Sequence, residues 1–353
     1  MRDDTCPCTN SAPSSRQESR LLRAEAELMS AKAPQGTFAD GPVHSVLLFP
    51  GQGSQTPNYL HELPEHAAVR ATFDEARDVL HVDPSGLDSA TTLNSTVAVQ
   101  LGVLIAGVAY VRVLASKGVF PDAVAGLSVG AFTAAVASGA LDFDAALRLV
   151  RLRAESMEQA YGQGGYGMAA ILGLGEAAVQ TLIDCIARPE RPLYLAGVNA
   201  PAEIIVAGSD AALTAATDAV AQMGARARRL SVSVPSHCSL LDEVTTRLRE
   251  AMRQVRLDKP RVPYIGNVRA RALQSGTEIA EDLVLNVSRT VRWHESVMLL
   301  YELGARVFIE APPGHALSNL VKNEFPQARA LAAAEVQLDS VVQVARRVSG
   351  APL

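Results

Sequence analysis

The stretch Ala123-Val-Ala-Gly-Leu-Ser-Val-Gly130 joins a short apolar run to a segment of small residues and contains the pattern Gly-x-Ser-x-Gly. The apolar run predicts a buried strand, and residues 131–138 predict a helix. The two glycines permit a tight turn that pushes the hydroxyl of Ser128 out of the sheet, next to the N–H groups that begin the helix. The pattern favours Ser128 as a nucleophile over a glycine-rich turn with an incidental serine.

Around this turn, predicted strands and helices alternate. A buried strand begins at residue 43, an apolar helix spans 95–117, and another helix spans 143–160. The same alternation resumes after Pro235 and continues to the end of the chain. This order predicts an α/β fold, with a large α/β-hydrolase-like domain built on a parallel sheet.

The alternation is interrupted at Tyr161-Gly-Gln-Gly-Gly-Tyr-Gly167, where four glycines in seven residues cannot sustain a helix. The segment that follows predicts the order βαββαβ, which is that of a ferredoxin-like unit. We therefore expect a large domain in two parts, 43–160 and 235–353, interrupted by a small ferredoxin-like subdomain at 161–234. Residues 1–42 lack apolar periodicity and are predicted to be a disordered extension.

Composition excludes several classes of protein. The 353 residues carry 32 Lys and Arg against 37 Asp and Glu, a net charge of −5, without the basic cluster that nucleic-acid binding requires. No uninterrupted apolar run is long enough for a membrane span, and no secretory signal is present. The cysteines have no metal-ligand spacing; they are Cys6, Cys8, Cys185 and Cys238. We expect a cytoplasmic protein with reduced thiols, no metal, no nucleic-acid partner and no membrane.

A nucleophilic serine requires a base, and three histidines are candidates. His237 lies where the chain returns from the small subdomain, His294 lies in a predicted helix, and His315 follows a Pro-Gly turn. The residues alone leave this choice open. They also leave open whether Arg153, on a mostly apolar helix, extends to solvent or points inward to bind an anion. A loop centred on Gln52 follows the first strand, at the sheet edge where α/β proteins bind ligands.

Several blocks in order give the chain a family resemblance, from about residue 46 to 336. They are Leu48-Phe-Pro-Gly-Gln-Gly-Ser-Gln55, Gly126-Leu-Ser-Val-Gly130, Val198-Asn-Ala-Pro201, Val232-Ser-Val-Pro-Ser-His237 and Pro313-Gly-His-Ala-Leu317. The sequence resembles the malonyl-CoA:acyl-carrier-protein transacylases. The resemblance implies an S-malonyltransferase that moves malonyl from malonyl-CoA, through a malonyl-serine, to the prosthetic-group thiol of an acyl carrier protein, with no bound cofactor.

The resemblance also implies roles for single residues. Ser128 matches the acylated serine and His237 the general base, while Gln52 and the N–H of Val129 match the oxyanion donors. Arg153 matches the residue that binds the malonyl carboxylate. Asn286 falls where the main-chain carbonyl of a Gln or Asn orients the histidine, in place of the acid of a catalytic triad.

The elbow departs from the family pattern at two positions. The family usually has His before the serine and Glu after the second glycine, and this chain has Leu127 and Ala131. These residues, with the segment Tyr264-Ile-Gly-Asn-Val-Arg-Ala-Arg-Ala-Leu273, most resemble the epsilon subunit of malonate decarboxylase, which implies the carrier subunit of that enzyme as partner. The alternatives are a malonyl transacylase of fatty-acid synthesis, a serine thioesterase or hydrolase, and a non-catalytic scaffold that docks carrier proteins.

Overall fold

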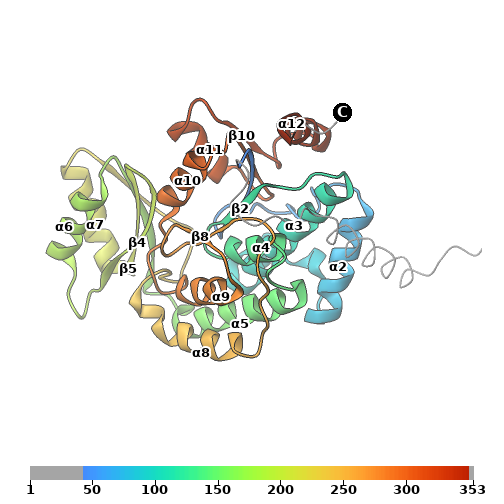
Figure 1. Cartoon of the computed structure of the whole chain (residues 1–353). Helices are drawn as coiled ribbons and strands as arrows, with labels where there is room; N and C mark the ends of the chain where they lie inside the picture. Colours follow the sequence, from blue (N-terminus) through green and yellow to red (C-terminus); the bar gives the residue numbers. More distant parts are fainter. Residues whose placement is uncertain (1–42, 350–353) are drawn as a thin grey trace, which may run out of the picture.

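The computed structural model describes residues 43–349. The predicted N-terminal extension at 1–42, with Cys6 and Cys8, lies outside the described residues. The described chain forms two β-sheets, one of six strands and one of four, each covered by helices (Figure 1).

The six-stranded sheet has the order β10-β9-β1-β2-β7-β8. Its strands are β1 (Ser45–Phe49), β2 (Ala123–Gly126), β7 (Tyr264–Ile265), β8 (Ala272–Leu273), β9 (Val307–Glu310) and β10 (Arg329–Ala332). Five of them run parallel, whereas β8 runs antiparallel to β7. The prediction of an α/β fold on a mostly parallel sheet is confirmed, and β8 joins the edge in an antiparallel hairpin because its connection to β7 is short.

Side chains alternate between the two faces of the central strands. Leu47 and Phe49 join the larger core, while Val46 and Leu48 join a second core on the opposite face. The larger core is covered by α2 (Ala67–Leu80), α3 (Thr96–Ser116), α4 (Gly130–Ala137), α5 (Phe143–Tyr161), α8 (Asp242–Met252), α9 (Gly276–Leu285) and α12 (Leu338–Ser349). The second is covered by α10 (Trp293–Glu302) and α11 (Ala316–Glu324). The strands are thus buried on both faces, as their continuous apolar sequences predict.

Helix α3 is long and apolar enough to span a membrane by length and composition alone. In this fold most of its residues are buried, and it contacts α2, α4 and α5. The helix therefore forms the centre of the larger core. Sequence analysis did not predict α2, whose N-terminus is capped by the His66 side chain.

The four-stranded sheet has the order β4-β5-β3-β6 and is antiparallel throughout. Its elements are β3 (Tyr166–Leu172), α6 (Glu176–Ile186), β4 (Leu193–Ala200), β5 (Glu203–Ser209), α7 (Asp210–Gln222) and β6 (Arg226–Arg229). This order and connectivity are ferredoxin-like, with α6 and α7 packed together on the outer face (Figure 1). The last strand was predicted to continue to residue 234 but ends at Arg229, since the chain then leaves the sheet and buries Val234 against Met157.

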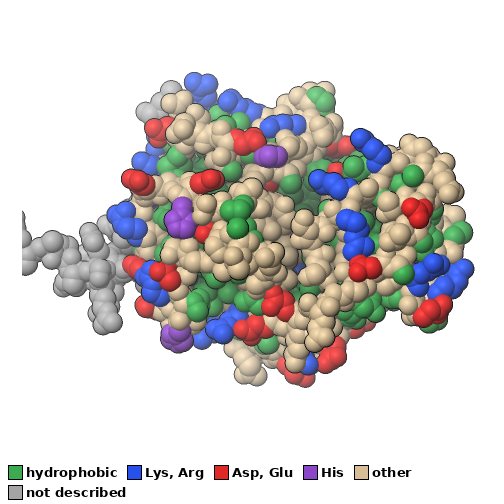
Figure 2. Space-filling model, turned by 180° about the vertical axis from the view of Figure 1, so that it is seen from behind, with side chains coloured by type: hydrophobic (Ala, Val, Ile, Leu, Met, Phe, Trp, Pro, Cys, Tyr) green, Lys and Arg blue, Asp and Glu red, His purple; other side chains and the backbone are tan. Residues whose placement is uncertain are grey.

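One segment of the large domain joins the small sheet. Val291 exchanges backbone hydrogen bonds with β4, donating to the carbonyl of Ala196 and accepting from the N–H of Val198. Arg292 pairs with Glu176 at the start of α6 through two N–H groups, at 2.7 and 3.1 Å. The segment 286–292 therefore fixes the small subdomain against the large one. On the face seen in Figure 2, positive and negative side chains are interspersed, and no extended basic surface forms.

Candidate active site

Ser128 lies in the turn between β2 and α4 with φ of 56°, a left-handed conformation that is costly for a residue with a side chain. The flanking glycines allow this turn. A Cβ on Gly126 would lie 2.0 Å from the carbonyl oxygen of Gly130, and a Cβ on Gly130 would lie 2.2 Å from that of Phe49. Both contacts are with backbone, so no larger residue fits at either position. The Ser128 side chain is consequently held out of the sheet, at half-buried depth.

Arg153 points inward from α5 and is 1% exposed, whereas Arg148 and Arg151 on the same helix are exposed. One Nη of Arg153 donates to Ser128 Oγ at 3.1 Å and the other donates to Gln100 Oε1. Its Nε–H is buried without a partner among residues 43–349. Burial lowers the pKa of Arg153 to about 10, so the guanidinium remains charged at neutral pH. The site therefore contains a buried cation that pairs with no carboxylate of residues 43–349, and it is suited to bind an anion.

The loop after β1 lies directly against the serine turn. Phe49 pairs with Gly126 at the carboxyl ends of adjacent parallel strands, and its carbonyl accepts the N–H of Leu127 at 2.9 Å. The backbone N–H groups of Gln52 and Val129 donate to no other group within the described part of the chain. Free N–H groups in the serine turn and in the adjoining loop are donors of the kind that can stabilise an oxyanion.

His237 follows β6 in a second turn, also with positive φ, at 65°. Its backbone N–H donates to the carbonyl of Val287, and its ring Nδ1 lies 2.5 Å from the carbonyl oxygen of Asn286. The carbonyl only accepts, so it places the proton on Nδ1 and leaves Nε2 as the basic nitrogen. Burial, reinforced by the charge of Arg153, lowers the pKa of His237 to about 3. The imidazole is therefore neutral at physiological pH.

Asn286 contacts both turns. Its main-chain carbonyl orients the His237 ring, and its side-chain Nδ2 donates to the main-chain carbonyl of Ser128 at 3.0 Å. Ser128 Oγ accepts from Arg153, and no hydrogen bond between Ser128 and His237 is present in the region from 43 to 349. Asn286 is the residue that connects these two.

The structure brings six predicted residues into one region. Ser128, Arg153, His237 and Asn286 are linked by the contacts above, Val129 follows Ser128 in the same turn, and Gln52 lies in the adjoining loop after β1. The other two candidate bases lie elsewhere. His294 is on α10 beside a small pocket with Phe325, and His315 pairs with Glu335. Arg153 points inward, which settles the orientation that its sequence left open.

Two residues of the site were not predicted from the sequence. Gln100 is buried in α3, where its Oε1 accepts from Arg153 and its Nε2 lies 3.5 Å from Gln52 Oε1. Asn267, just after β7, accepts the N–H of Ser128 at 2.9 Å and donates to the carbonyl of Gly126 at 2.8 Å. A signal for Gln100 existed, because it is a lone amide in a long apolar helix. For Asn267 the signal was its place at the carboxyl end of the strand next to β2.

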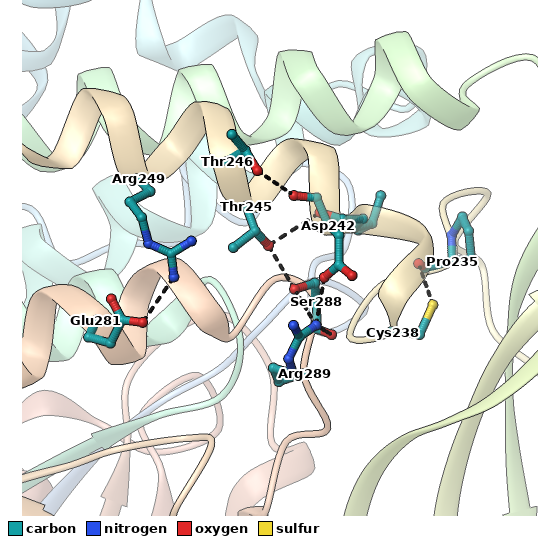
Figure 3. Close-up of polar contacts among 10 residues, drawn as sticks. Pro235, Cys238, Asp242, Thr245, Thr246, Arg249, Glu281, Ser288 and Arg289 are labelled. Atoms are coloured by element: carbon teal, nitrogen blue, oxygen red, sulfur yellow. Dashed lines mark hydrogen bonds and ion pairs between the residues drawn. The ribbon is translucent and has the colours of Figure 1, made fainter.

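A groove of about 280 Å³ opens beside His237, lined in part by Tyr194, Thr290 and Cys238. The Cys238 thiol donates to the carbonyl of Pro235 (Figure 3), and burial raises its pKa to about 12, so it is not a thiolate. No group of His, Cys, Asp and Glu side chains suited to hold a metal ion occurs between residues 43 and 349.

Comparison with known proteins gives concordant matches. A family model described as an acyl transferase domain matches residues 46–345. The malonyl CoA-acyl carrier protein transacylase of Haemophilus influenzae is 35% identical over 306 residues, covering 84% of this chain and 97% of that protein. The crystal structure of an acyl carrier protein S-malonyltransferase from Vibrio cholerae matches with a TM-score of 0.79 and 34% identity, over 84% of this chain and 99% of that one.

A further match is a malonyl transacylase solved in complex with the acyl carrier protein of a type II polyketide synthase. It has a TM-score of 0.81 and 32% identity, and the match covers 87% of this chain and 99% of that one.

Proposed function

The chain belongs to the acyl transferase family, and from this premise we propose that it transfers malonyl from malonyl-CoA to the thiol of an acyl carrier protein. The single observation that carries the proposal is the buried, uncompensated guanidinium of Arg153, 3.1 Å from the hydroxyl of an elbow serine. A serine nucleophile beside a buried cation is suited to an acyl group that ends in a carboxylate.

The first half-reaction forms a malonyl-serine. The malonyl carboxylate binds Arg153, which releases Ser128 Oγ from its hydrogen bond with the guanidinium and lets it turn to His237. Nε2 of His237 takes the hydroxyl proton as Oγ attacks the thioester carbonyl, and the N–H groups of Gln52 and Val129 stabilise the oxyanion. The C–S bond then breaks, and coenzyme A leaves with the proton from His237.

The second half-reaction reverses the first with a different thiol. The thiol of the carrier's prosthetic group gives its proton to His237 and attacks the malonyl ester, and Ser128 leaves with that proton. Atoms and charges balance over the two steps with a thioester as donor and a thiol as acceptor, so the proposal requires no bound cofactor.

Arg153 also supplies selectivity. An acetyl group would leave the guanidinium without an anion in a buried site, and an unpaired buried charge is costly. A site built to bind a polar group rejects the analogue that lacks it more strongly than an apolar pocket rejects a missing methylene. We therefore expect malonyl to be preferred over acetyl.

As its acceptor we propose the carrier of malonate decarboxylase. The support is the elbow sequence, in which Leu127 and Ala131 stand where the family usually has His and Glu and resemble the epsilon subunit of malonate decarboxylase. In the structure Leu127 packs in the second core with Ile265, and Ala131 is buried in the larger one. The names of the relatives given above mention only an acyl carrier protein, and they fit a carrier of fatty-acid synthesis equally.

The test is to incubate the protein with radiolabelled malonyl-CoA and locate the label by mass spectrometry. The expected result is one malonyl group on Ser128, absent from Ser128→Ala. The carriers of malonate decarboxylase and of fatty-acid synthesis are then added separately, with water as the third acceptor. Absence of label from Ser128 contradicts the mechanism, preference for the fatty-acid carrier contradicts the acceptor, and rapid release to water indicates a hydrolase.

A further inference from the structure

The backbone of Ser128 is bound at both ends by asparagine side chains. Asn267 Oδ1 accepts its N–H at 2.9 Å, and Asn286 Nδ2 donates to its carbonyl at 3.0 Å. Asn267 makes a further bond, from Nδ2 to the carbonyl of Gly126 at 2.8 Å, so its amide bridges two backbone groups on either side of Leu127. The asparagines are 139 and 158 residues away in sequence and come from different segments.

These bonds satisfy the polar groups of a residue in an unfavourable conformation. The left-handed φ of Ser128 costs about 1 kcal/mol or more, and such conformations persist where the surroundings determine them. Asn267 is 2% exposed and Asn286 is fully buried, so water cannot replace their amides.

A buried carboxylate fixes Asn267 in turn. The two oxygens of Asp282 accept the backbone N–H groups of Asn267 and Val268, both at 3.0 Å. Burial raises the pKa of Asp282, and these two N–H bonds oppose that shift. Asp282 is 7% exposed, and between residues 43 and 349 its carboxylate makes no hydrogen bond to Ser128, Arg153 or His237.

The last turn of α9 supplies both parts of this arrangement. Asp282 and Asn286 are four residues apart, and the N–H of Asn286 donates to the carbonyl of Asp282 at 2.9 Å. Residues at this spacing share one face of a helix. The same turn thus fixes Asn267 through Asp282, the Ser128 carbonyl through the Asn286 side chain, and the His237 ring through the Asn286 carbonyl.

We propose that Asn267, Asp282 and the Asn286 side chain are positioning residues that hold Ser128 at a fixed distance and angle from His237. We name these three residues the elbow clamp. The inference rests on the proposed function of Ser128 as nucleophile and deepens it. The elbow clamp touches no substrate; it acts through the backbone of Ser128, where a displacement of about 1 Å can cost 100-fold in rate.

The experiment measures the rate of malonyl-Ser128 formation by rapid quenching, across malonyl-CoA concentrations. In Asn267→Ala the maximal rate is expected to fall about 30-fold, and in Asn286→Ala, which keeps the main-chain carbonyl on His237, about 10-fold. The half-saturating concentration of malonyl-CoA should stay within about twofold in both, because neither variant removes Arg153 or Gln100, which holds its guanidinium. Asp282→Asn should likewise lower the maximal rate, by a smaller factor, and leave the half-saturating concentration unchanged.

The matched control is Thr245→Val. Thr245 Oγ1 donates to Ser288 Oγ at 2.7 Å in a buried bond near the His237 turn (Figure 3), outside the elbow clamp. This variant should lose melting temperature comparably to Asn267→Ala, since each removes buried hydrogen bonding, yet keep the wild-type acylation rate within about twofold.

The outcomes separate the two hypotheses. If wild-type protein carries no malonyl on Ser128, the proposed function fails. If the wild type is labelled and folded Asn267→Ala and Asn286→Ala acylate as fast as Thr245→Val, the elbow clamp is overturned. A rise in the half-saturating concentration without a loss of maximal rate overturns it too. Should Asn267→Ala not fold, Asn286→Ala and Asp282→Asn give the same decision.

Discussion

The two turns that carry Ser128 and His237 are alike in conformation and different in how they are held. Both place a residue with a side chain at positive φ, 56° and 65°, and both depend on Asn286 for a hydrogen bond. The serine turn has glycines on both sides, where a Cβ would collide with backbone. The histidine turn, Pro235-Ser-His-Cys238, has none. The serine turn thus has a local requirement, its glycines, in addition to distant partners, whereas the histidine turn depends on partners that lie 49 and 50 residues later.

This difference teaches which of the two turns can be predicted from sequence. Steric exclusion of side chains leaves a local mark, because only glycine fits. A hydrogen bond from a distant carbonyl leaves none, since every residue has a carbonyl. If the two turns nevertheless act as one unit, changes in either turn should affect the same step, malonyl transfer to and from Ser128.

The largest effect is expected from removing either reacting side chain. Ser128→Ala and His237→Ala should each lower kcat by about 10⁵-fold, and the double variant should lose little more, because residues that act as a unit are not additive. Steady-state malonyl transfer measures all three. Losses that multiply in the double variant would show that the two turns act independently.

The next effect distinguishes how each turn is held. Gly126→Ala places a Cβ 2.0 Å from the Gly130 carbonyl oxygen, so we expect a loss of about 3 kcal/mol in stability and about 10³-fold in acylation. Ser236→Ala, beside His237, removes no hydrogen bond that the described residues make and should change acylation less than about threefold.

Thermal unfolding and acylation rates are measured for both variants. Gly86→Ala is the control for glycine replacement as such, because a Cβ there meets nothing within 4 Å. Similar losses in Gly126→Ala and Ser236→Ala would erase the contrast between the turns.

The same distinction explains how much of the fold was predictable. Apolar runs such as Val43–Phe49 predicted the buried strands because burial on both faces demands continuous hydrophobicity. The order of strands and helices predicted the ferredoxin-like subdomain. The two-residue strands β7 and β8 carry too little pattern to predict β8. Strand β6 ends at Arg229 although its partner β3 extends further, because the chain leaves the sheet to bury Val234, which is a tertiary contact.

In the site, features that depend on neighbouring residues could be predicted from the sequence, and features that depend on distant residues could not. Gly-x-Ser-x-Gly identified Ser128 because the turn needs its glycines. The choice of His237 over His294 and His315 came from the family resemblance, since burial and the Asn286 carbonyl are tertiary facts. The inward direction of Arg153 is likewise a tertiary fact. It follows from the packing of α5 against α3, where Gln100 Oε1 accepts a hydrogen bond from the Arg153 guanidinium.

A smaller effect is expected at Arg153, which contacts the serine turn directly and acts on the histidine turn through its charge. Arg153→Met should lower malonyl transfer about 100-fold while acetyl transfer is retained, because the buried cation is lost and no longer penalises a neutral acyl group. The ratio of kcat/KM for malonyl-CoA to that for acetyl-CoA is the measurement. Arg148→Met, exposed on the same helix, is the control and should leave the ratio unchanged. An unchanged ratio in Arg153→Met removes this residue from the carboxylate role.

The smallest effect is a change in pH dependence, which reports how the serine side acts on the histidine. Burial first, and the charge of Arg153 second, lower the pKa of His237 to about 3. Removing the charge in Arg153→Met should raise this pKa, so the acid limb of kcat/KM for acetyl-CoA moves to higher pH but stays below the ordinary value near 6.5, because burial remains. An exposed pair, Arg151 with Glu155, gives the control Arg151→Met, in which the limb should not move.

The lowered pKa of His237 also makes the stability of the fold depend on pH. As pH falls from 6.5 towards 3, the unfolded chain binds a proton on His237 that the folded chain does not, so folding weakens over that window. His237→Gln should remove this part of the pH dependence of stability. Arg153→Met should narrow the pH window, because a higher pKa of His237 in the folded state lies closer to its pKa in the unfolded state. The contrary outcome is that the acid limb of kcat/KM shifts in Arg153→Met while the pH range over which stability falls stays as wide as in the wild type. That outcome would mean that the pKa seen in the kinetics belongs to a group other than His237. The two turns would then be joined only by the Asn286 contacts.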